Sequence, residues 1–535
     1  MKETNQPASL GLWSLMCWAL PWLILNAAQA QTTNYSLGTA ALLEGPAAGS
    51  DSVVLAVNPP TGSWTAATSV TWLHLNTANQ NGAGSTNVVF TYDANPGVTR
   101  SGNLTIAGLT LNVTQAGATY VAAGAVIQLA NSGSGLSRPV GVAVDAAGNV
   151  YVADWNEGAI YKWTAAINTF TLLISAGLFH PGAVAVDGVG NVYIADTLAS
   201  AIKMWTAANS NVTVLVSSGL DQPDGVAVDG AGNVYFSDTG NNAVKKWTAV
   251  DDSVTTLVSS GLNVPVNLSV DLAGNLYIAD WGNNAIKELT AANNTVTTLV
   301  SSGLSLPIGV SVDGAGNVYI ADTGNNAIKV WTAGDNTVTA LAASGLNQPL
   351  AIAADRADNV YIADPLNSAL EELPHAFVDP TAKLESCAAG SDVLPVVLPA
   401  TANLLAPFAP TSDETWLTIT GITNGVVSFS VAANTGPPRI GFISLLGQTI
   451  PIVQVSSDAP LDLICVPTGG KGSFQLAFGG TQNGSFTVLS TTNLFLPMKD
   501  WAVIGTASNI GPNLFEFTDP YPATNIQRYY RVRSP

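Results

Sequence analysis

The sequence predicts an all-β protein with a propeller at its centre. Three observations support this: six repeats of 42 residues, Gly- and Asn-containing turns between short β-branched runs, and a composition with only 10% charged residues. Repeats of about 40 residues that each hold four short strands are typical of propeller blades. We therefore expect a six-bladed β-propeller flanked by β-sandwich domains.

The repeat is defined by one proline and two aspartates. The proline stands at Pro139, Pro181, Pro223, Pro265, Pro307 and Pro349. The first aspartate stands at Asp145, Asp187, Asp229, Asp271, Asp313 and Asp355. The second stands at Asp154, Asp196, Asp238, Asp280, Asp322 and Asp364. Each series advances by 42 residues without an insertion.

Four strands, a to d, are expected in each unit. In the fifth repeat they fall at residues 309–312, 318–321, 327–331 and 337–341. The turn at 313–317 contains Gly and Asn, which tolerate positive φ. The last strand is rich in Thr and Val, as strands prefer.

The sixth repeat has no Thr/Val-rich fourth strand. A spare strand, residues 125–130, precedes the first repeat instead. We expect it to complete blade six, because closing the ring leaves no sheet edge unpaired at the seam. The propeller then spans 120–374, and the chain enters and leaves it at one seam.

The core of the repeat, Gly-Val-Ala-Val-Asp followed by Gly-Asn-Val-Tyr-Ile-Ala-Asp-Thr-Gly-Asn-Asn, resembles the NHL repeat family. The Gly-His and Trp-Asp signatures of WD40 repeats are absent from the sequence. The resemblance covers nearly half of the chain and implies the propeller fold. It says less about function, because this family includes scaffolds, RNA binders, sensors and some lyases.

Two flanking segments, 33–117 and 378–456, resemble each other. Each places Asn five residues before Arg and Arg fifteen before Gln: Asn95, Arg100 and Gln115, then Asn434, Arg439 and Gln454. Each is predicted to be an Ig-like sandwich. The pattern resembles the BACON module, which implies carbohydrate contact or a spacer role. Phe408 replaces Trp64 in the second copy, and we expect Trp72 and Trp416 to belong to the cores.

The ends of the chain complete the domain map. Residues 1–30 have the apolar core and the Ala28-Gln29-Ala30 ending of a secretory signal peptide. No second apolar run of about 18 residues follows, so we expect no transmembrane segment after cleavage. The mature protein would be secreted or attached to a bacterial envelope or surface.

Residues 460–535 are predicted to form a small β-module. Cys387 and Cys465 are expected to be free thiols, with a disulfide as the alternative.

Charge and chemistry restrict the function. With 17 basic and 36 acidic residues, the net charge of −19 argues against nucleic acid as a partner.

We expect a monomer without a cofactor, a metal or catalytic residues. The chain has only three histidines, and the first strands of the blades begin with aliphatic residues rather than the Glu, Asn and Asp ring of lactonases. The repeated aspartates are expected to form Asx-turns; calcium binding is the alternative.

One sector of the top face, formed by the d–a and b–c loops, departs from the repeat. The b–c loops of blades three to five are nearly identical, whereas those of blades six, one and two differ. The nearby d–a loops add Arg138, Phe179 and His180, so a cation, an acid, an imidazole and two aromatic side chains would meet there. A ligand would contact Arg138, Trp155, Glu157 and His180. The alternative is drift of exposed loops around the seam.

These patterns favour a secreted, non-catalytic binding or scaffold protein. Its propeller would present a top face to a protein or glycan ligand, and its BACON-like modules could add carbohydrate contacts. The alternative is a propeller enzyme of the lyase or lactonase type.

Overall fold

A computed structural model describes residues 33–124 and 126–455, and further on 464–467, 474–479, 485–492, 496–511, 514–519 and 528–533. The expected signal peptide, residues 1–30, lies outside the described residues, as does the side chain of Cys465. Cys387 is a half-buried free thiol. The described part of the chain is built from β-strands and short 3-10 helices, and none of its helices has the length and apolar character needed to cross a bilayer.

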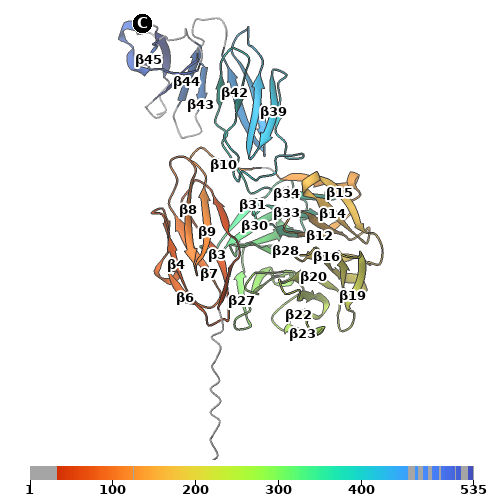
Figure 1. The fold of residues 1–535 in the computed structure, drawn as a ribbon. Helices are drawn as coiled ribbons and strands as arrows, with labels where there is room; N and C mark the ends of the chain where they lie inside the picture. The colour runs from red at the N-terminus through yellow and green to blue at the C-terminus, as the bar shows by residue number, and fades with distance from the viewer. Residues whose placement is uncertain are drawn as a thin grey trace, which may run out of the picture.

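The centre of the described chain folds into six antiparallel four-stranded sheets, one for each repeat (Figure 1). Blade one contains β12 (Pro139–Val144), β13 (Val150–Asp154), β14 (Ala159–Thr164) and β15 (Thr169–Ile174). Blade two contains β16 (Pro181–Val186), β17 (Val192–Asp196), β18 (Ala201–Thr206) and β19 (Asn211–Val216). Blade three contains β20 (Pro223–Val228), β21 (Val234–Asp238), β22 (Ala243–Thr248) and β23 (Ser253–Val258).

The other three blades follow the same plan. Blade four contains β24 (Pro265–Val270), β25 (Leu276–Asp280), β26 (Ala285–Thr290) and β27 (Thr295–Val300). Blade five contains β28 (Pro307–Val312), β29 (Val318–Asp322), β30 (Ala327–Thr332) and β31 (Thr337–Ala342). Blade six contains β32 (Ala351–Ala354), β33 (Val360–Asp364), β34 (Ala369–Leu373) and β11 (Ile127–Ala130).

The first strands of the blades form a closed ring. Each contacts the first strand of the next blade, and β32 contacts β12. The second strands lie between neighbouring blades and are buried along their whole length. This burial on both faces explains their uninterrupted apolar runs, such as Val-Tyr-Ile-Ala, before a terminal aspartate. The fourth strands form the rim, where Leu172 and Val214 are among the exposed aliphatic side chains.

The seam of the ring lies in blade six. There β11 pairs antiparallel with β34, with Ile127 opposite Glu372 and Gln128 opposite Glu371. Just before β11, the short strand β10 (Val121–Ala122) pairs with β35 (Phe377–Val378), which follows β34. The segments that enter and leave the ring therefore run side by side.

The N-terminal module is a sandwich of two sheets. One has the order β1 (Asn34–Leu37), β3 (Gly49–Asn58), β7 (Thr86–Tyr92), β5 (Leu73–His74). The other has the order β2 (Ala41–Glu44), β9 (Leu109–Gln115), β8 (Arg100–Ile106), β4 (Ser63–Thr68), β6 (Asn81–Ala83). Its core includes the buried Trp64 and Phe90.

The module after the propeller is a smaller sandwich. Its sheets are β36 (Lys383–Glu385), β42 (Gln448–Gln454), β41 (Arg439–Leu445), β38 (Thr411–Ser412), and β37 (Gly390–Val393), β40 (Val426–Val431), β39 (Leu417–Thr423). One apolar cluster joins its core to blades one and six, including Val397, Phe429 and Trp163.

The C-terminal described strands form two further sheets. One is β43 (Ile464–Pro467), β44 (Phe474–Gly479), β48 (Leu514–Thr518), β47 (Ser508–Gly511), and the other is β46 (Ala502–Thr506), β45 (Thr487–Thr491), β49 (Tyr529–Arg533). Their apolar side chains, including Phe478 and Phe515, pack into one cluster.

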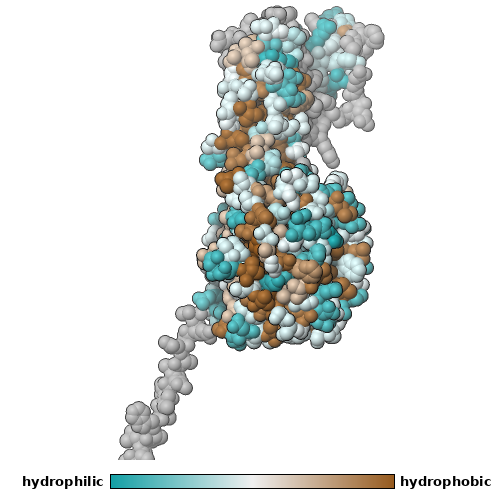
Figure 2. All heavy atoms as spheres, turned by 90° about the vertical axis from the view of Figure 1, so that its right-hand side faces the viewer, coloured by the Kyte–Doolittle hydropathy of each residue, from teal (hydrophilic) through white to brown (hydrophobic). Residues whose placement is uncertain are grey.

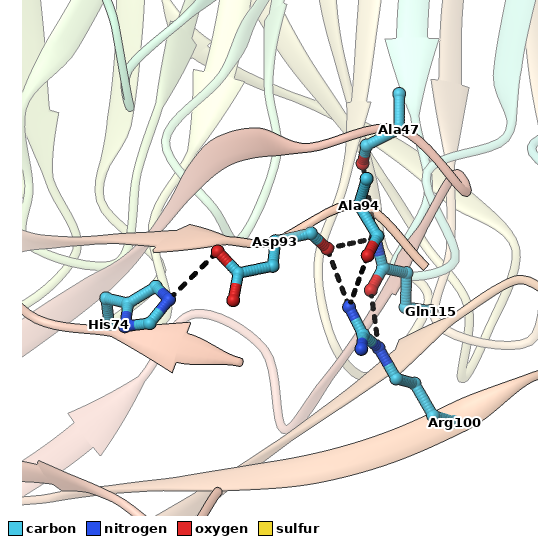
Figure 3. Close-up of polar contacts among 6 residues, drawn as sticks. All are labelled: Ala47, His74, Asp93, Ala94, Arg100 and Gln115. Carbon is cyan, nitrogen blue, oxygen red and sulfur yellow. Dashed lines mark hydrogen bonds and ion pairs between the residues drawn. The ribbon is translucent and has the colours of Figure 1, made fainter. Parts of the chain in front are cut away.

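An Arg–Gln pair ties the strands of the N-terminal module together (Figure 3). The Arg100 side chain donates to Gln115 Oε1 at 2.9 Å and to the Asp93 carbonyl at 2.7 Å. The Gln115 amide donates in turn to the carbonyls of Gly45, Ala47 and Asp93. The Arg100 guanidinium also lies 4.4 Å from the centre of the Trp72 ring. The Arg and Gln of the repeated Asn…Arg…Gln pattern therefore link strands of the sandwich through hydrogen bonds.

The second module repeats this arrangement. Arg439 donates to Gln454 Oε1 at 2.8 Å and covers the Trp416 ring at 4.2 Å. In each module an arginine thus occupies one face of the tryptophan that the sequence suggested as a core residue. Both rings are half-buried rather than fully enclosed.

The N-terminal module docks on one turn of blade five. Its strand β3 donates from Val54 N to the Gly314 carbonyl at 3.1 Å, and the Ser52 hydroxyl donates to the Ala315 carbonyl at 2.5 Å. A Cβ atom on Gly314 would lie 2.5 Å from the carbonyl oxygen of Gly38, so the approach requires a glycine there. The same turn exists in every blade, and in blade five it is a docking surface.

This interface buries carboxyl groups against each other. Asp51 lies beside Asn317, whose amide donates to Asp51 Oδ1 at 3.3 Å, and Asp313 belongs to the same turn. Burial, with a smaller contribution from the charge of Asp51, raises the pKa of Asp313 to about 7. Burial and the neighbouring Glu44 raise the pKa of Asp51 well above its usual range. At neutral pH the interface therefore holds protons that the unfolded chain would release.

Removing β11 should open the ring. A chain that begins at Ser132 lacks β11 and leaves β34 as an unpaired edge, whereas one that begins at Thr119 retains it. Both lack the N-terminal module, so they differ only at the seam, in β11 and in the two-residue strand β10. We expect the shorter chain to be less stable by about 1–3 kcal/mol, because cross-strand pairs and ladder hydrogen bonds are lost. Thermal unfolding measures this, and equal midpoints would contradict the role of β11.

Acidification should stabilise the interface. A carboxyl whose folded pKa lies above its unfolded value binds more protons when folded, so stability falls as pH rises from about 4 towards 7. Asp313→Asn removes this titration, and we expect a higher unfolding midpoint than wild type at pH above about 7 and a flatter pH profile. Asp229→Asn, at the same turn position of blade three, is the control and should show no such gain. The profiles are measured by calorimetry, and parallel profiles for all three proteins would contradict the prediction.

Candidate ligand-binding face

Three of the four predicted site residues form one stack on the top face of blades one and two. The Trp155 and His180 rings lie 5.1 Å apart between centroids, and the Arg138 guanidinium lies 5.6 Å from the centre of the Trp155 ring. The Phe179 ring lies 5.0 Å from the His180 ring, and both ring pairs are tilted rather than parallel. The order is therefore Arg138, Trp155, His180, Phe179.

The backbone orients this stack. His180 directly precedes β16 and has φ of 59°, a left-handed conformation that costs a non-glycine residue about 1 kcal/mol. Its ring nitrogen Nδ1 lies 2.7 Å from the carbonyl oxygen of Trp155, which fixes the imidazole against the loop between β13 and β14. His180 therefore links two neighbouring blades through both a hydrogen bond and a ring contact.

Arg138 adopts a different backbone conformation from its equivalents. In the other five blades the residue before the proline has a positive φ, at His180, Gln222, Val264, Leu306 and Gln348, and Arg138 does not share it. Instead, its N–H donates to both carboxylate oxygens of Asp154 at 3.1 Å, next to Ser137 N at 2.7 Å. This local difference turns the arginine towards Trp155.

Glu157 is placed beside the stack but not within it. Its backbone N–H donates to Asp154 Oδ1 at 3.2 Å, and its side chain is exposed. Among the described residues, its carboxylate makes no hydrogen bond or ion pair with Arg138 or His180 and no contact with the Trp155 ring.

The stack is open to solvent. Phe179 is 57% exposed, and Leu198 of the next b–c loop is 42% exposed. Over the side of the molecule seen in Figure 2, apolar and hydrophilic side chains alternate, which is ordinary for a protein surface. The four stacked side chains therefore stand out by their mutual contacts and chemistry, with an aromatic face, an imidazole and a cation on adjoining loops.

Asp224 is a polar residue near this sector that sequence reasoning missed. It accepts a hydrogen bond from the Thr197 hydroxyl at 3.3 Å, and burial raises its pKa to about 6. A Cβ on Gly182 of the neighbouring blade would lie 2.4 Å from its Oδ1, so that glycine makes room for the carboxyl. The signal was present in the repeat alignment. Asp224 is the charged member of a series that otherwise contains Val140, Gly182, Val266, Ile308 and Leu350.

The centre of the ring is a small cavity of about 180 Å³. It is lined by the first strands, with Val142, Val184, Val226, Leu268, Val310 and Ile352 among its residues. Its polar side chains are Asn267, Ser269 and Ser311, and the hydroxyls of the two serines accept backbone N–H groups of the blade beyond. The surface of the cavity is mostly polar, because the aliphatic side chains of the first strands, such as Val142 and Val184, are buried in the clusters between blades.

The three histidines are dispersed. His74 lies on the N-terminal module, 3.1 Å from Asp93 (Figure 3). His375 is buried near the seam, with Nε2 2.9 Å from the Leu43 carbonyl, and burial lowers its pKa.

The repeated aspartates accept hydrogen bonds from the backbone of the turns that they begin. Asp145 Oδ1, for example, accepts the N–H groups of Ala147 and Asn149 at 2.9 Å. Among the described residues, no three His, Cys, Asp or Glu side chains are grouped as metal ligands.

Comparison with known families agrees with this architecture. The BACON family model, "Putative binding domain, N-terminal", matches residues 62–116, and the NHL repeat model matches residues 136–160 and 304–331. The chain carries NHL repeats and a BACON domain. The matched NHL segments lie in blades one and five, and the BACON match covers the strands that hold Arg100 and Gln115.

Solved structures with a similar fold have diverse functions. An auxiliary nutrient binding protein from Bacteroides thetaiotaomicron is 12% identical, with 64% of this chain and 96% of that chain covered and a TM-score of 0.41. A gluconolactonase from Xanthomonas campestris is 18% identical, with 47% and 89% covered and a TM-score of 0.41. A streptogramin B lyase is 14% identical, with 48% and 98% covered and a TM-score of 0.38. No curated protein matches the sequence. Similarities this low carry no argument about function.

Proposed function

We propose that this protein is a non-catalytic binding protein whose ligand docks on the Arg138–Trp155–His180–Phe179 stack of the NHL propeller. The observation that carries the proposal is the continuity of this stack across two blades. Exposed aromatic rings next to an arginine are typical of the residues that dominate binding energy at protein interfaces. A cation on a protein of net charge −19 also supplies a local site for an acidic group.

The ligand we propose is an extended protein segment or glycan chain with an apolar face and a carboxylate. The apolar face would lie on the exposed ring of Phe179, and the carboxylate would pair with Arg138, whose planar guanidinium suits it. Glu157, at the edge of the stack, would select against a second acidic group by repulsion. The BACON domain contributes less to this proposal, because Arg100 occupies one face of Trp72.

The interior of the ring supports binding rather than catalysis. The residues that line its cavity include no His, Asp or Glu, and the described histidines stand on three separate parts of the molecule. A lyase or lactonase needs an acid–base pair or a metal in reach of one bound substrate. We also propose that the protein acts outside the cell, as its N-terminal sequence indicates.

Alanine substitution tests the stack. We expect Trp155→Ala and Arg138→Ala each to weaken ligand binding at least tenfold, or about 1.4 kcal/mol, because each removes a face of the binding surface. The probes are a glycan array with neutral and acidic sugars and a displayed peptide library, both screened with the full chain. Affinities of the selected binders are then measured by calorimetry.

Trp281→Ala is the matched control. Trp281 occupies the position of Trp155 in blade four, but Val264 and Leu306 stand there in place of Arg138 and His180. We expect this variant to bind as wild type does. Unchanged binding by both Trp155→Ala and Arg138→Ala would refute the proposal, as would equal losses in all three variants.

A further inference from the structure

Four blades hold a lysine ammonium at the same internal place. Lys203, Lys245, Lys287 and Lys329 extend from the third strands of blades two to five, and each Nζ lies 2.5–2.7 Å from the buried aspartate that ends the second strand. Each ammonium also donates to a glycine carbonyl of the preceding d–a loop, at Gly177, Gly219, Gly261 and Gly303. A buried aspartate and a carbonyl thus share one cation in each of these blades.

In blade one the buried aspartate and the glycine carbonyl are hydrogen-bonded without a cation. Tyr161 replaces the lysine, and its hydroxyl donates to the Gly135 carbonyl at 3.0 Å. The Asp154 carboxylate is instead surrounded by backbone N–H donors from Ser137, Arg138, Asn156 and Glu157. Every buried oxygen of this aspartate can therefore find a partner.

Blade six differs because an acid replaces the lysine. Glu371 pairs with Ile362 in the sheet, as Lys203 pairs with Ile194 in blade two. Asp364 is completely buried and Glu371 is 7% exposed, and Asp364 Oδ1 and Glu371 Oε2 have no hydrogen-bond partner. Asn367 donates to the other Asp364 oxygen at 2.9 Å and to the Gly345 carbonyl at 3.0 Å.

Two buried carboxyl groups on the paired strands β33 and β34, without a counter-charge, are unfavourable. Burial and the charge of Asp364 raise the pKa of Glu371 to about 7. A buried carboxylate that lacks a partner costs several kcal/mol, so a neutralising species is strongly favoured at this place. In four sister blades that species is a cation, and the geometry that holds it is set by the same strands.

We infer that blade six binds a calcium ion between Asp364 Oδ1 and Glu371 Oε2, the two buried oxygens of this pair that have no hydrogen-bond partner. Both side-chain ligands are hard carboxylate oxygens, which select Ca²⁺ over softer metals. Water would complete the coordination, because calcium accepts water as a ligand and the Gly345 carbonyl already accepts a hydrogen bond from Asn367. With only two carboxylates, we expect a dissociation constant of about 10⁻⁴–10⁻³ M, the range of extracellular calcium modules.

The position of this site implies a structural role for the ion. Glu371 lies on β34, directly opposite Gln128 of the closing strand β11. Neither Asp364 nor Glu371 lines the central cavity, so the proposed site is separate from the channel. Calcium would therefore stabilise the seam of the ring, independently of the ligand proposed for the top face.

The test is calcium binding to the full chain and to Glu371→Lys. By calorimetry after EDTA treatment, we expect wild type to bind one Ca²⁺ and to gain thermal stability from it. Glu371→Lys recreates the lysine–aspartate pair of the sister blades, so we expect it to bind no calcium at this place and to unfold at the same temperature with and without the ion. Asp251→Lys, with the same change of charge on an exposed turn, should behave as wild type.

A second variant tests the inference if Glu371→Lys does not fold. Glu371→Gln keeps the size of the side chain and removes its charge, and we expect calcium binding at least tenfold weaker than wild type. Wild type that binds no calcium up to about 10 mM would overturn the inference. So would calcium binding that persists in both variants. A stability profile that depends on pH but not on calcium would show that the two acids share a proton instead.

Discussion

The buried aspartate at the end of each second strand is the interaction on which the propeller depends. Its side chain is completely buried in all six blades, from Asp154 to Asp364. It accepts a backbone N–H from the d–a loop 17 residues earlier, as Asp196 does from Phe179 at 2.7 Å. A charge in such a position needs compensation. The compensation differs between blades: it comes from a lysine in blades two to five, from backbone donors in blade one, and from one backbone N–H and the Asn367 amide in blade six.

This requirement also shapes the candidate binding face. In blade one the carboxylate of Asp154 accepts the N–H of Arg138. Arg138 does not have the positive φ that its five equivalents share. In blade two the N–H of Phe179 is held by Asp196, and the following residue, His180, takes a left-handed conformation. The same buried group therefore positions both ends of the stack.

Much of the fold follows from the sequence. The strands expected in the fifth repeat match β28 to β31 to within one or two residues, because strand length and turn residues repeat without insertion. Arg138, Trp155 and His180 could be grouped in advance, because equal repeats place equivalent loops on one face. Phe179 belonged to the same predicted sector, whereas Asp224 was visible only as a departure from the repeat. Glu157 shows that a shared loop does not guarantee a shared contact.

The sequence by itself determined the repeat, the all-β class and the sector in which the blades differ, because a fixed period of 42 residues admits few folds. Only the tertiary structure decided which partner each side chain meets. It showed that one turn of blade five, identical in pattern to the others, is buried under the N-terminal module. It also showed that Asp364 Oδ1 and Glu371 Oε2 are buried without a hydrogen-bond partner. Such contacts join residues that are distant in the chain or on different strands, so their energies depend on packing that no local pattern encodes.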